Sequence, residues 1–257
     1  MSAASLAIAG VREQVKPEEW AIRQDLAAAY RLVAQFGWDD LIFTHLSARI
    51  PGPEHHFLIN PYGLLFDEIT ASNLVKIDLD GQPVIDTPYG TNAAGFTIHG
   101  AIHEARDDAQ CVMHLHTLDG SAVATMEEGL MPLNQTTMLI REDVAYHEYE
   151  GVALNLDERT RLVADLGEKN LMMLWNHGTL SLGRNVGEAF ARMYLLERAC
   201  SMQVRGLSGG SGLHMPSAEA IATTAAQGRA AMDMGVGDLL WPALLRRLDK
   251  TDASFRD

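Results

Sequence analysis

The chain has few cysteines, no cluster of basic residues and no long apolar run, and each absence excludes a class of protein. Its two cysteines, Cys111 and Cys200, provide neither a disulfide framework nor a thiolate metal site, which indicates a reducing compartment. The formal net charge is −14, so we expect neither nucleic acid nor an anionic membrane as a partner, because both would repel it. No apolar run approaches the length of a membrane span, and residues 1–10 lack the basic start of a secretion signal. We therefore expect a cytoplasmic protein.

Composition and periodicity indicate a globular α/β chain. Hydrophobic residues make up 47% and charged residues 21% of the 257 positions, as in ordinary globular domains. Pro17 and two acidic residues predict the start of a helix that Gly37 ends. The segment 41–85 contains short extended runs between Pro-Gly, Pro-x-Gly and Asp-Gly turn signals, which predicts antiparallel strands over 41–50, 56–60, 74–78 and 83–85.

Helical and extended patterns alternate after residue 92. We predict helices from residue 92, around 121–128, from Asp157, over 188–205 and from Pro216, and strands over 110–116, near Leu139 and within 171–183. Because no linker interrupts this order, we expect a single domain over residues 17–257, whose last part, 208–257, is a helical tail. Residues 1–16 are expected to form a flexible arm.

Three histidines carry the strongest chemical signal. In an extended strand His114 and His116 project to the same side, roughly 6.6 Å apart along the strand. A second buried strand pattern, residues 171–175, brings His177 beside Gly178. Three neutral imidazoles are the ligand set of catalytic zinc and related divalent ions, with open positions for water or substrate. The spacing predicts a divalent metal site, for zinc first and for manganese, iron or cobalt otherwise; the alternative is a chance pair among ten histidines.

Four separated motifs point to a known family. They are residues 44–49 (THLSAR), 61–63 (PYG), 114–116 (HLH) and 176–178 (NHG). In order and approximate spacing they resemble the class II aldolase and adducin head superfamily, in particular its adducin-like bacterial branch. The resemblance implies a three-layer α/β/α fold around a central, mainly antiparallel sheet, with a divalent ion on the three histidines. It also implies a small-molecule substrate and a homo-oligomer, often a cyclic homotetramer with the site near a subunit boundary.

The chain departs from this family's sugar-phosphate aldolases in two ways. Where they hold a phosphate with a Gly-Asn pair, a threonine before a glycine and a Ser-Ser pair, this chain has Thr44-His45, Tyr62 and Ala93-Ala94. A dianionic phosphate needs several aimed donors, so we expect a substrate without phosphate. In addition, Gly95 stands where the aldolases place the glutamate that binds the metal and moves a proton. Gly95 can instead serve close packing near the start of a helix, and both interpretations stay open.

Three further residues are candidates for catalysis. His99 lies one turn after Gly95 on the same helix face, where it can hydrogen-bond substrate, orient a metal ligand or be a satisfied core histidine. His45 and Tyr62 occupy the altered binding loops, where either can donate a proton to a developing oxyanion or merely close a pocket.

These residues favour a divalent-metal-dependent carbon–carbon lyase. We expect a decarboxylase or a retro-aldolase that acts on a non-phosphorylated carbonyl or hydroxy-acid substrate, with the ion stabilising an enolate. Two alternatives stay open. One is a catalytically silent adducin-like binding module, and the other is a metal hydrolase that uses a metal-bound hydroxide.

Overall fold

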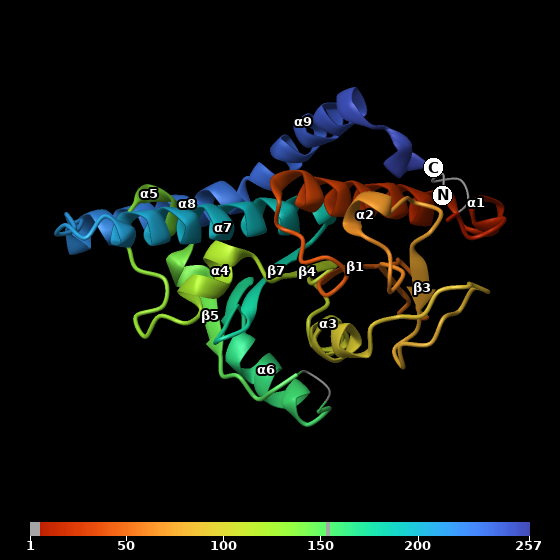
Figure 1. Ribbon diagram of the computed structural model, residues 1–257, viewed down its shortest axis with the longest axis horizontal. Coiled ribbons are helices and arrows are strands. Elements are labelled where there is room, and N and C mark those ends of the chain that lie inside the picture. The colour runs from red at the N-terminus through yellow and green to blue at the C-terminus, as the bar shows by residue number, and fades with distance from the viewer. Residues whose placement is uncertain (1–5, 153–154) are drawn as a thin grey trace.

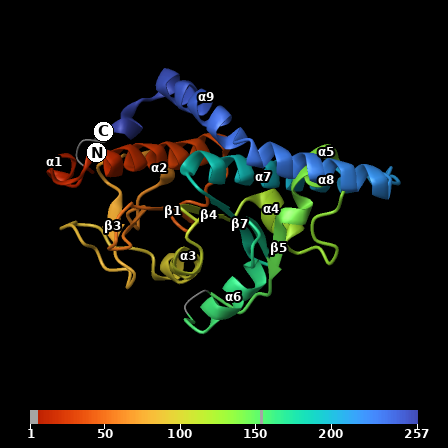
Figure 2. The same ribbon diagram turned by 180° about the vertical axis from the view of Figure 1, so that it is seen from behind.

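Three layers make up the molecule. The computed structural model describes residues 6–152 and 155–257, except for the side chains of residues 93, 94 and 96. Figures 1 and 2 show a central sheet with α2 (Pro17–Phe36), α7 (Val186–Ser208) and α9 (Val236–Thr251) on one side. The helices α3 (Ala93–Ala105) and α6 (Glu158–Leu166) lie on the other side. The predicted three-layer α/β/α fold is therefore confirmed.

Within the described residues, seven strands form one sheet in the order β3-β2-β1-β4-β7-β6-β5. Every neighbouring pair is antiparallel except β5 and β6, which are parallel, so the sheet is mainly antiparallel as expected. The central pairing of β1 with β4 places His45 directly opposite His114. The strands are β1 (His45–Arg49), β2 (Phe57–Ile59), β3 (Val75–Ile77), β4 (Cys111–Leu115), β5 (Val144–His147), β6 (Leu171–Leu174) and β7 (Gly178–Gly183).

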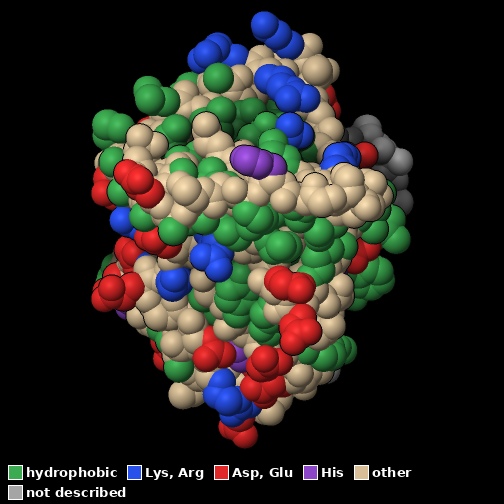
Figure 3. Space-filling view, turned by 90° about the vertical axis from the view of Figure 1, so that its left-hand side faces the viewer, with side chains coloured by type: hydrophobic (Ala, Val, Ile, Leu, Met, Phe, Trp, Pro, Cys, Tyr) green, Lys and Arg blue, Asp and Glu red, His purple; other side chains and the backbone are tan. Residues whose placement is uncertain are grey.

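Shorter helices complete the chain. They are α1 (Val11–Gln14), α4 (Leu118–Val123), α5 (Gln135–Ile140) and α8 (Ala218–Asp233), with 3-10 turns η2 (Phe66–Glu68), η3 (Arg141–Asp143) and η4 (Ser254–Arg256). The helix α8 packs closely on α5, because a Cβ added at Gly228 would lie 2.0 Å from the carbonyl oxygen of Leu139. Figure 3 views the end of the molecule where α7 and α8 meet, on which hydrophobic side chains are interspersed with charged ones.

The helix ends predicted from Pro17, Gly37 and the segment at Pro216 agree with the structure. The helix α2 begins at Pro17 and ends before Gly37, whose φ of 68° is the left-handed conformation that glycine adopts at little cost. The Ser217 side chain accepts a hydrogen bond from the Ala220 N–H and so starts α8, the first of the two helices of the predicted tail.

Two sequence predictions are wrong. The segment around Leu139 is helix α5 rather than a strand, since the Asn134 side chain accepts from the Thr137 N–H and caps a helical turn. Residues 83–85 contribute an isolated bridge between Ile77 and Pro83 instead of a strand. The flexible arm at 1–16 stays a prediction; within it, Ile8 and Val11 are buried and the Ile8 N–H donates to the Ser72 carbonyl. Residues 1–5 lie outside the described part of the chain.

Apolar side chains fill both interfaces of the sheet. The larger core lies between the sheet and α2, α7 and α9 and includes Leu26, Leu46, Met113 and Phe190. The smaller one lies under α3 and α6 and includes Ile102, Val112 and Leu180. Their burial anchors β1 and β4, which carry most of the site. Among the described residues, no helix is long and apolar enough to cross a membrane.

Candidate metal centre

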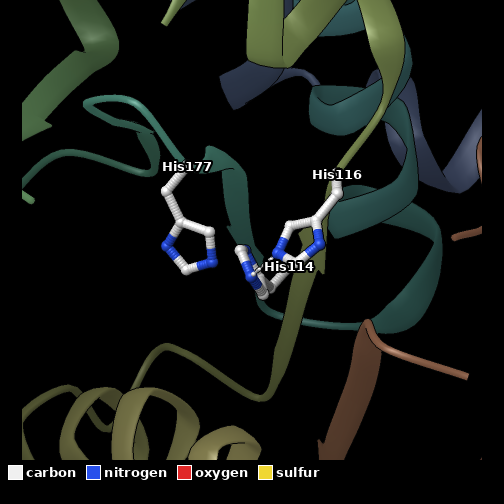
Figure 4. Close-up of side chains that lie close together, drawn as sticks. All are labelled: His114, His116 and His177. Carbon is white, nitrogen blue, oxygen red and sulfur yellow. Dashed lines mark hydrogen bonds between the residues drawn. The ribbon is translucent and has the colours of Figure 1, made fainter. Parts of the chain in front are cut away.

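The three predicted histidines come together at one point. Figure 4 shows the imidazoles of His114, His116 and His177 facing one another, with ring centroids 4.7 to 4.8 Å apart. One ligand atom from each lies within 4.8 Å of the others, and no other such group occurs in the described part of the chain. This geometry is consistent with the predicted metal site formed by the three histidines.

Strand and hairpin geometry places each imidazole. His114 belongs to β4, and His116 follows it by two residues and so faces the same side. His177 lies in the three-residue loop between β6 and β7, where its N–H donates to the Leu174 carbonyl at 3.0 Å. The preceding Asn176 has a φ of 57°, and this left-handed turn directs His177 toward β4.

Hydrogen bonds set the proton positions on two of the rings. His114 Nδ1 donates to the Thr179 carbonyl at 3.0 Å, and His116 Nδ1 donates to Asp40 Oδ2 at 3.1 Å. Each neutral ring then carries its lone pair on Nε2. The two Nε2 atoms are 3.0 Å apart, close to the roughly 3.3 Å expected between two nitrogens that share a tetrahedral zinc ion. Two lone pairs at this distance repel unless a cation lies between them, so the donor set fits a metal ion.

The protonation of these histidines favours metal binding as well. Burial and, to a smaller extent, the neighbouring His116 lower the pKa of His177 to about 4. Burial also holds the pKa of His114 well below its usual value. Since a metal ion binds the neutral imidazole, neither ring must lose a proton at neutral pH before it can act as a ligand.

A cavity of about 430 Å³ opens above the histidines. Phe43, Tyr62, Tyr149 and Val152 line it together with the three histidines, and no Lys or Arg is among its described lining residues. Tyr62 is 45% exposed, and its backbone N–H donates to the Gly90 carbonyl at 3.0 Å. The side chains of Ala93 and Ala94, named above for the phosphate site, lie outside the described residues. The described wall thus provides aromatic and apolar surface but no cation to hold a phosphate.

The His45 ring occupies the space beside Gly95. A Cβ added at Gly95 would lie 2.8 Å from both Cδ2 and Nε2 of this ring, nearer than non-bonded atoms approach. His45 is only 3% exposed, and burial lowers its pKa to about 3. The ring therefore fills the volume in which a side chain at position 95 would begin. Both interpretations of Gly95 converge, because the packing that requires glycine also removes the carboxylate.

His99 lies behind His45 rather than at the cavity surface. Its ring centroid is 4.5 Å from that of His45, and its Nδ1 is 2.6 Å from Ser47 Oγ. His103 continues the contact, since its Nε2 is 2.7 Å from the same oxygen and its ring stacks on Phe57. The position of His99 suits an effect through His45 better than direct contact with substrate.

Sequence reasoning missed three residues of the site. Asp40 holds His116, and Tyr149 lies beside His177 with 6.1 Å between ring centroids. Both stand in segments without a recognisable motif. Ser47 was detectable, because it lies two residues after His45 in the same strand and must face the same side.

Comparison with known proteins defines the class. Residues 24–204 match the family described as the class II aldolase and adducin N-terminal domain, and the chain belongs to this family. It is 54% identical over 258 residues to a Caulobacter vibrioides protein named for class 2 aldolases, with 100% of each chain covered. It is 44% identical over 195 residues to alpha-adducin of Rattus norvegicus, a match that covers 74% of this chain and 26% of that protein.

Solved structures agree with this assignment. The fold superimposes with a TM-score of 0.93 on an aldolase II superfamily protein from Pseudomonas syringae, which is 51% identical, with 96% of this chain and 99% of that chain covered. It superimposes with a TM-score of 0.78 on an L-fuculose 1-phosphate aldolase from Glaciozyma antarctica, which is 25% identical, with 100% of both chains covered. The family and fold predicted from the four motifs are confirmed.

Proposed function

We propose that the protein is a divalent-metal-dependent carbon–carbon lyase that acts on a non-phosphorylated carbonyl or hydroxy-acid substrate. The observation that carries this proposal is the convergence of His114, His116 and His177 at the floor of the cavity. Zinc suits three imidazoles best, and manganese, iron or cobalt can take the same ligands. Membership of the class II aldolase family supports carbon–carbon chemistry, with decarboxylation and retro-aldol cleavage as its two forms.

The residues around the cluster suit this chemistry. A bound divalent ion would supply Lewis-acid stabilisation of an enolate, the species that both reactions share. Asp40 and the Thr179 carbonyl hold two of the ligand rings in a fixed orientation. Tyr62 lines the cavity, and its phenol can donate a proton to a developing oxyanion. Phe43 and Val152 give the cavity wall an apolar surface.

The missing cations support a substrate without phosphate. Phosphate recognition relies on Arg or Lys, on helix N-termini or on several aimed N–H groups. The described lining residues include no Lys or Arg. Carbonyl and hydroxy-acid substrates would instead rely on the ion that His114, His116 and His177 would hold, and they would place uncharged carbon against Phe43 and Tyr149.

A second candidate function is a catalytically silent binding module. The 44% identity with alpha-adducin over 195 residues favours it. The three buried or half-buried imidazoles count against it, because a scaffold gains nothing from histidines whose lone pairs repel one another.

Metal analysis and turnover together test the lyase proposal. We expect the purified protein to retain close to one equivalent of divalent metal by elemental analysis, and His177→Ala to lower metal affinity more than about a hundredfold. The exposed His55 provides a matched control, and His55→Ala is expected to retain the metal. Incubation with a panel of hydroxy- and keto-acids is expected to release carbon dioxide or two carbonyl fragments, as detected by mass spectrometry.

Two results would contradict the proposal. If His177→Ala binds metal as tightly as the parent, the three histidines are not the site. If the metal-loaded protein cleaves no acid of the panel but binds a protein partner, the silent module is favoured instead.

A further inference from the structure

One buried carboxyl group lies close to the strands of the histidine cluster and is not used by the proposed function. It belongs to Glu197 of α7, which is only 1% exposed. Its two oxygens accept hydrogen bonds from two hydroxyl groups, Oε1 from Thr179 at 2.8 Å and Oε2 from Thr117. Thr179 belongs to β7, and Thr117 lies two residues beyond the end of β4. The carboxyl group therefore joins both of these neighbouring segments to α7.

The first hydroxyl connects the carboxyl group to His114 through the sheet. Thr179 is the register partner of Leu115, so its side chain faces the same side as Leu115, whereas the side chain of His114 faces the other side. The backbone of Thr179 nevertheless reaches His114, because its carbonyl oxygen accepts from Nδ1 of that ring at 3.0 Å. A single residue thus bonds the carboxyl group on one face and orients an imidazole on the other.

The second hydroxyl connects the carboxyl group to the other two histidines. Thr117 comes directly after His116, and it caps α4, since its hydroxyl oxygen accepts a backbone N–H at 3.0 Å. In the same helix, Ser121 Oγ donates to the carbonyl oxygen of His177 at 3.1 Å. The start of α4 therefore follows one candidate ligand and contacts the loop of another, and the carboxyl group bonds this start to α7.

Close packing fixes the position of the carboxyl group. A Cβ added at Gly120 would lie 2.8 Å from Glu197 Oε1 and 2.5 Å from Thr117 Oγ1, so this space is fully occupied. For the hydroxyl of Thr179, the carboxylate is also a closer acceptor than the carbonyl oxygen of Leu115, which is 3.5 Å away. The two hydroxyls therefore share one acceptor group that has a single arrangement.

We propose that Glu197 is a positioning residue for the metal centre, because it fastens the segment after His116 and the residue that orients His114. This inference rests on the proposed function and assigns to its site a group that touches neither the ion nor the substrate. Without the carboxyl group, the two hydroxyls lose their common acceptor, and the segments that carry the imidazoles can shift independently of each other. The cluster would then no longer be held in the arrangement that binds the ion.

Metal titration tests this role. Metal-free protein is titrated with zinc in competition with a chelating dye, at a temperature where circular dichroism shows each variant to be folded. We expect Glu197→Ala to weaken zinc binding about 10- to 100-fold, the usual effect of removing a group that supports the ligands. Thr179→Val removes one hydroxyl and is expected to weaken binding about three- to tenfold, the value of one hydrogen bond. Thr179→Ser keeps the hydroxyl and is expected to restore the affinity of the parent.

Glu188 supplies the matched control. It is a second buried glutamate of α7, 4% exposed and in the first turn of the helix, where its carboxylate pairs with Arg192 at 2.7 Å and with Arg184 at 2.8 Å. We expect Glu188→Ala to lower the free energy of unfolding but to leave the zinc affinity of the folded protein unchanged. An equal loss of zinc affinity in both glutamate variants, or no loss in Glu197→Ala, would overturn the inference.

A measurement without metal separates this inference from the proposed function. In protein with isotope-labelled histidine, NMR detects the Nδ1 proton that His114 donates to the Thr179 carbonyl. We expect this proton to exchange with solvent at least about tenfold faster in Glu197→Ala than in the parent, and close to the parent's rate in Glu188→Ala. Unchanged exchange in Glu197→Ala would overturn the inference. If the parent binds no zinc but exchange differs as expected, the proposed function fails and the positioning of His114 by Glu197 stands.

Discussion

The contact between His45 and Gly95 makes one position in α3 intolerant of any side chain. A methyl group at residue 95 would lie 2.8 Å from two atoms of a buried ring. We expect Gly95→Ala to lower the free energy of unfolding by about 1–3 kcal/mol, the usual cost of overpacking. Urea denaturation measures this change. Gly206→Ala is the control, because residue 206 is also helical but its added Cβ would have no atom nearer than 3.9 Å. Equal stability of the two variants would contradict the close contact.

Asp40 fixes the orientation of a ligand ring from outside the cluster. Its carboxylate accepts from His116 Nδ1 and so keeps the lone pair of that ring on Nε2. We expect Asp40→Asn to weaken metal binding about 10- to 100-fold, as measured by competition with a chelating dye. Asp39→Asn changes the adjacent, exposed carboxylate and is expected to have no effect. If both variants bind the metal as the parent does, Asp40 has no part in the site.

The limits of sequence reasoning are visible at these same residues. The strand period alone predicts that His114 and His116 share a face, and it would have predicted the same for His45 and Ser47. It does not predict that the His45 ring fills the volume beside Gly95, since that contact joins residues 50 positions apart. Asp40 was missed for the same reason, because only the folded chain brings it to His116.

At the scale of elements, α7 carries a buried carboxyl group beneath the histidine cluster. Glu197 accepts hydrogen bonds from the hydroxyls of Thr117 and Thr179, and it is 1% exposed. Burial raises the pKa of Glu197 to about 7, against the partial effect of these hydrogen bonds. Because Thr117 follows His116 and Thr179 bonds His114, this carboxyl group connects α7 to the strands that hold the cluster.

The raised pKa gives α7 a pH-dependent effect on stability. Between the unfolded value of 4.5 and the native value of about 7, the native state holds a proton that the unfolded state has lost. The contribution of Glu197 to the stability of the folded state is therefore complete below pH 4.5 and is lost as the pH rises through 7. Relative to the parent, we expect the free energy of unfolding of Glu197→Gln to increase by up to about 3 kcal/mol as the pH rises from 4.5 to 8. Urea denaturation at a series of pH values measures this difference. The buried histidines have the opposite pH dependence, but both proteins share it. If the free energy of unfolding depends on pH in the same way in the parent and in Glu197→Gln, the raised pKa of Glu197 is contradicted.

Element prediction succeeded where local signals were strong and failed where they were weak. Pro17 and Gly37 fixed both ends of α2. The segment at Leu139 has β-branched neighbours typical of strands, but Asn134 caps it as a helix. The strand β5 was not predicted, because its four residues pair in parallel with β6, a partner distant in sequence.

The whole molecule exposes apolar side chains around the cavity. Phe43 is 51% and Tyr149 is 52% exposed, and both line the cavity. The resemblance to class II aldolases predicts a homotetramer with the site near a subunit boundary, and contact with a second copy would cover these side chains. We propose that light scattering will give a mass four times that of the 28.1 kDa chain.

A charged substitution tests this assembly. We expect Phe43→Asp to lower the mass in solution, because a buried interface does not accept an unpaired carboxylate. Leu239 is 78% exposed in α9, and Leu239→Asp is the control that should keep the mass of the parent. A monomeric parent, or an unchanged mass for Phe43→Asp, would contradict the prediction.

The pairing of His45 with Gly95 also constrains how this protein and the sugar-phosphate aldolases can be interconverted by mutation. A glutamate introduced at position 95 alone collides with the imidazole of His45, and a smaller residue introduced at position 45 alone leaves a void beside His99. Either single substitution is therefore disfavoured. When both are made together, the side chain at position 95 takes the space that the His45 ring vacates. The two positions are therefore expected to be strongly epistatic, so that an evolutionary path between the two types of site must cross a poorly folded intermediate or change both residues at once.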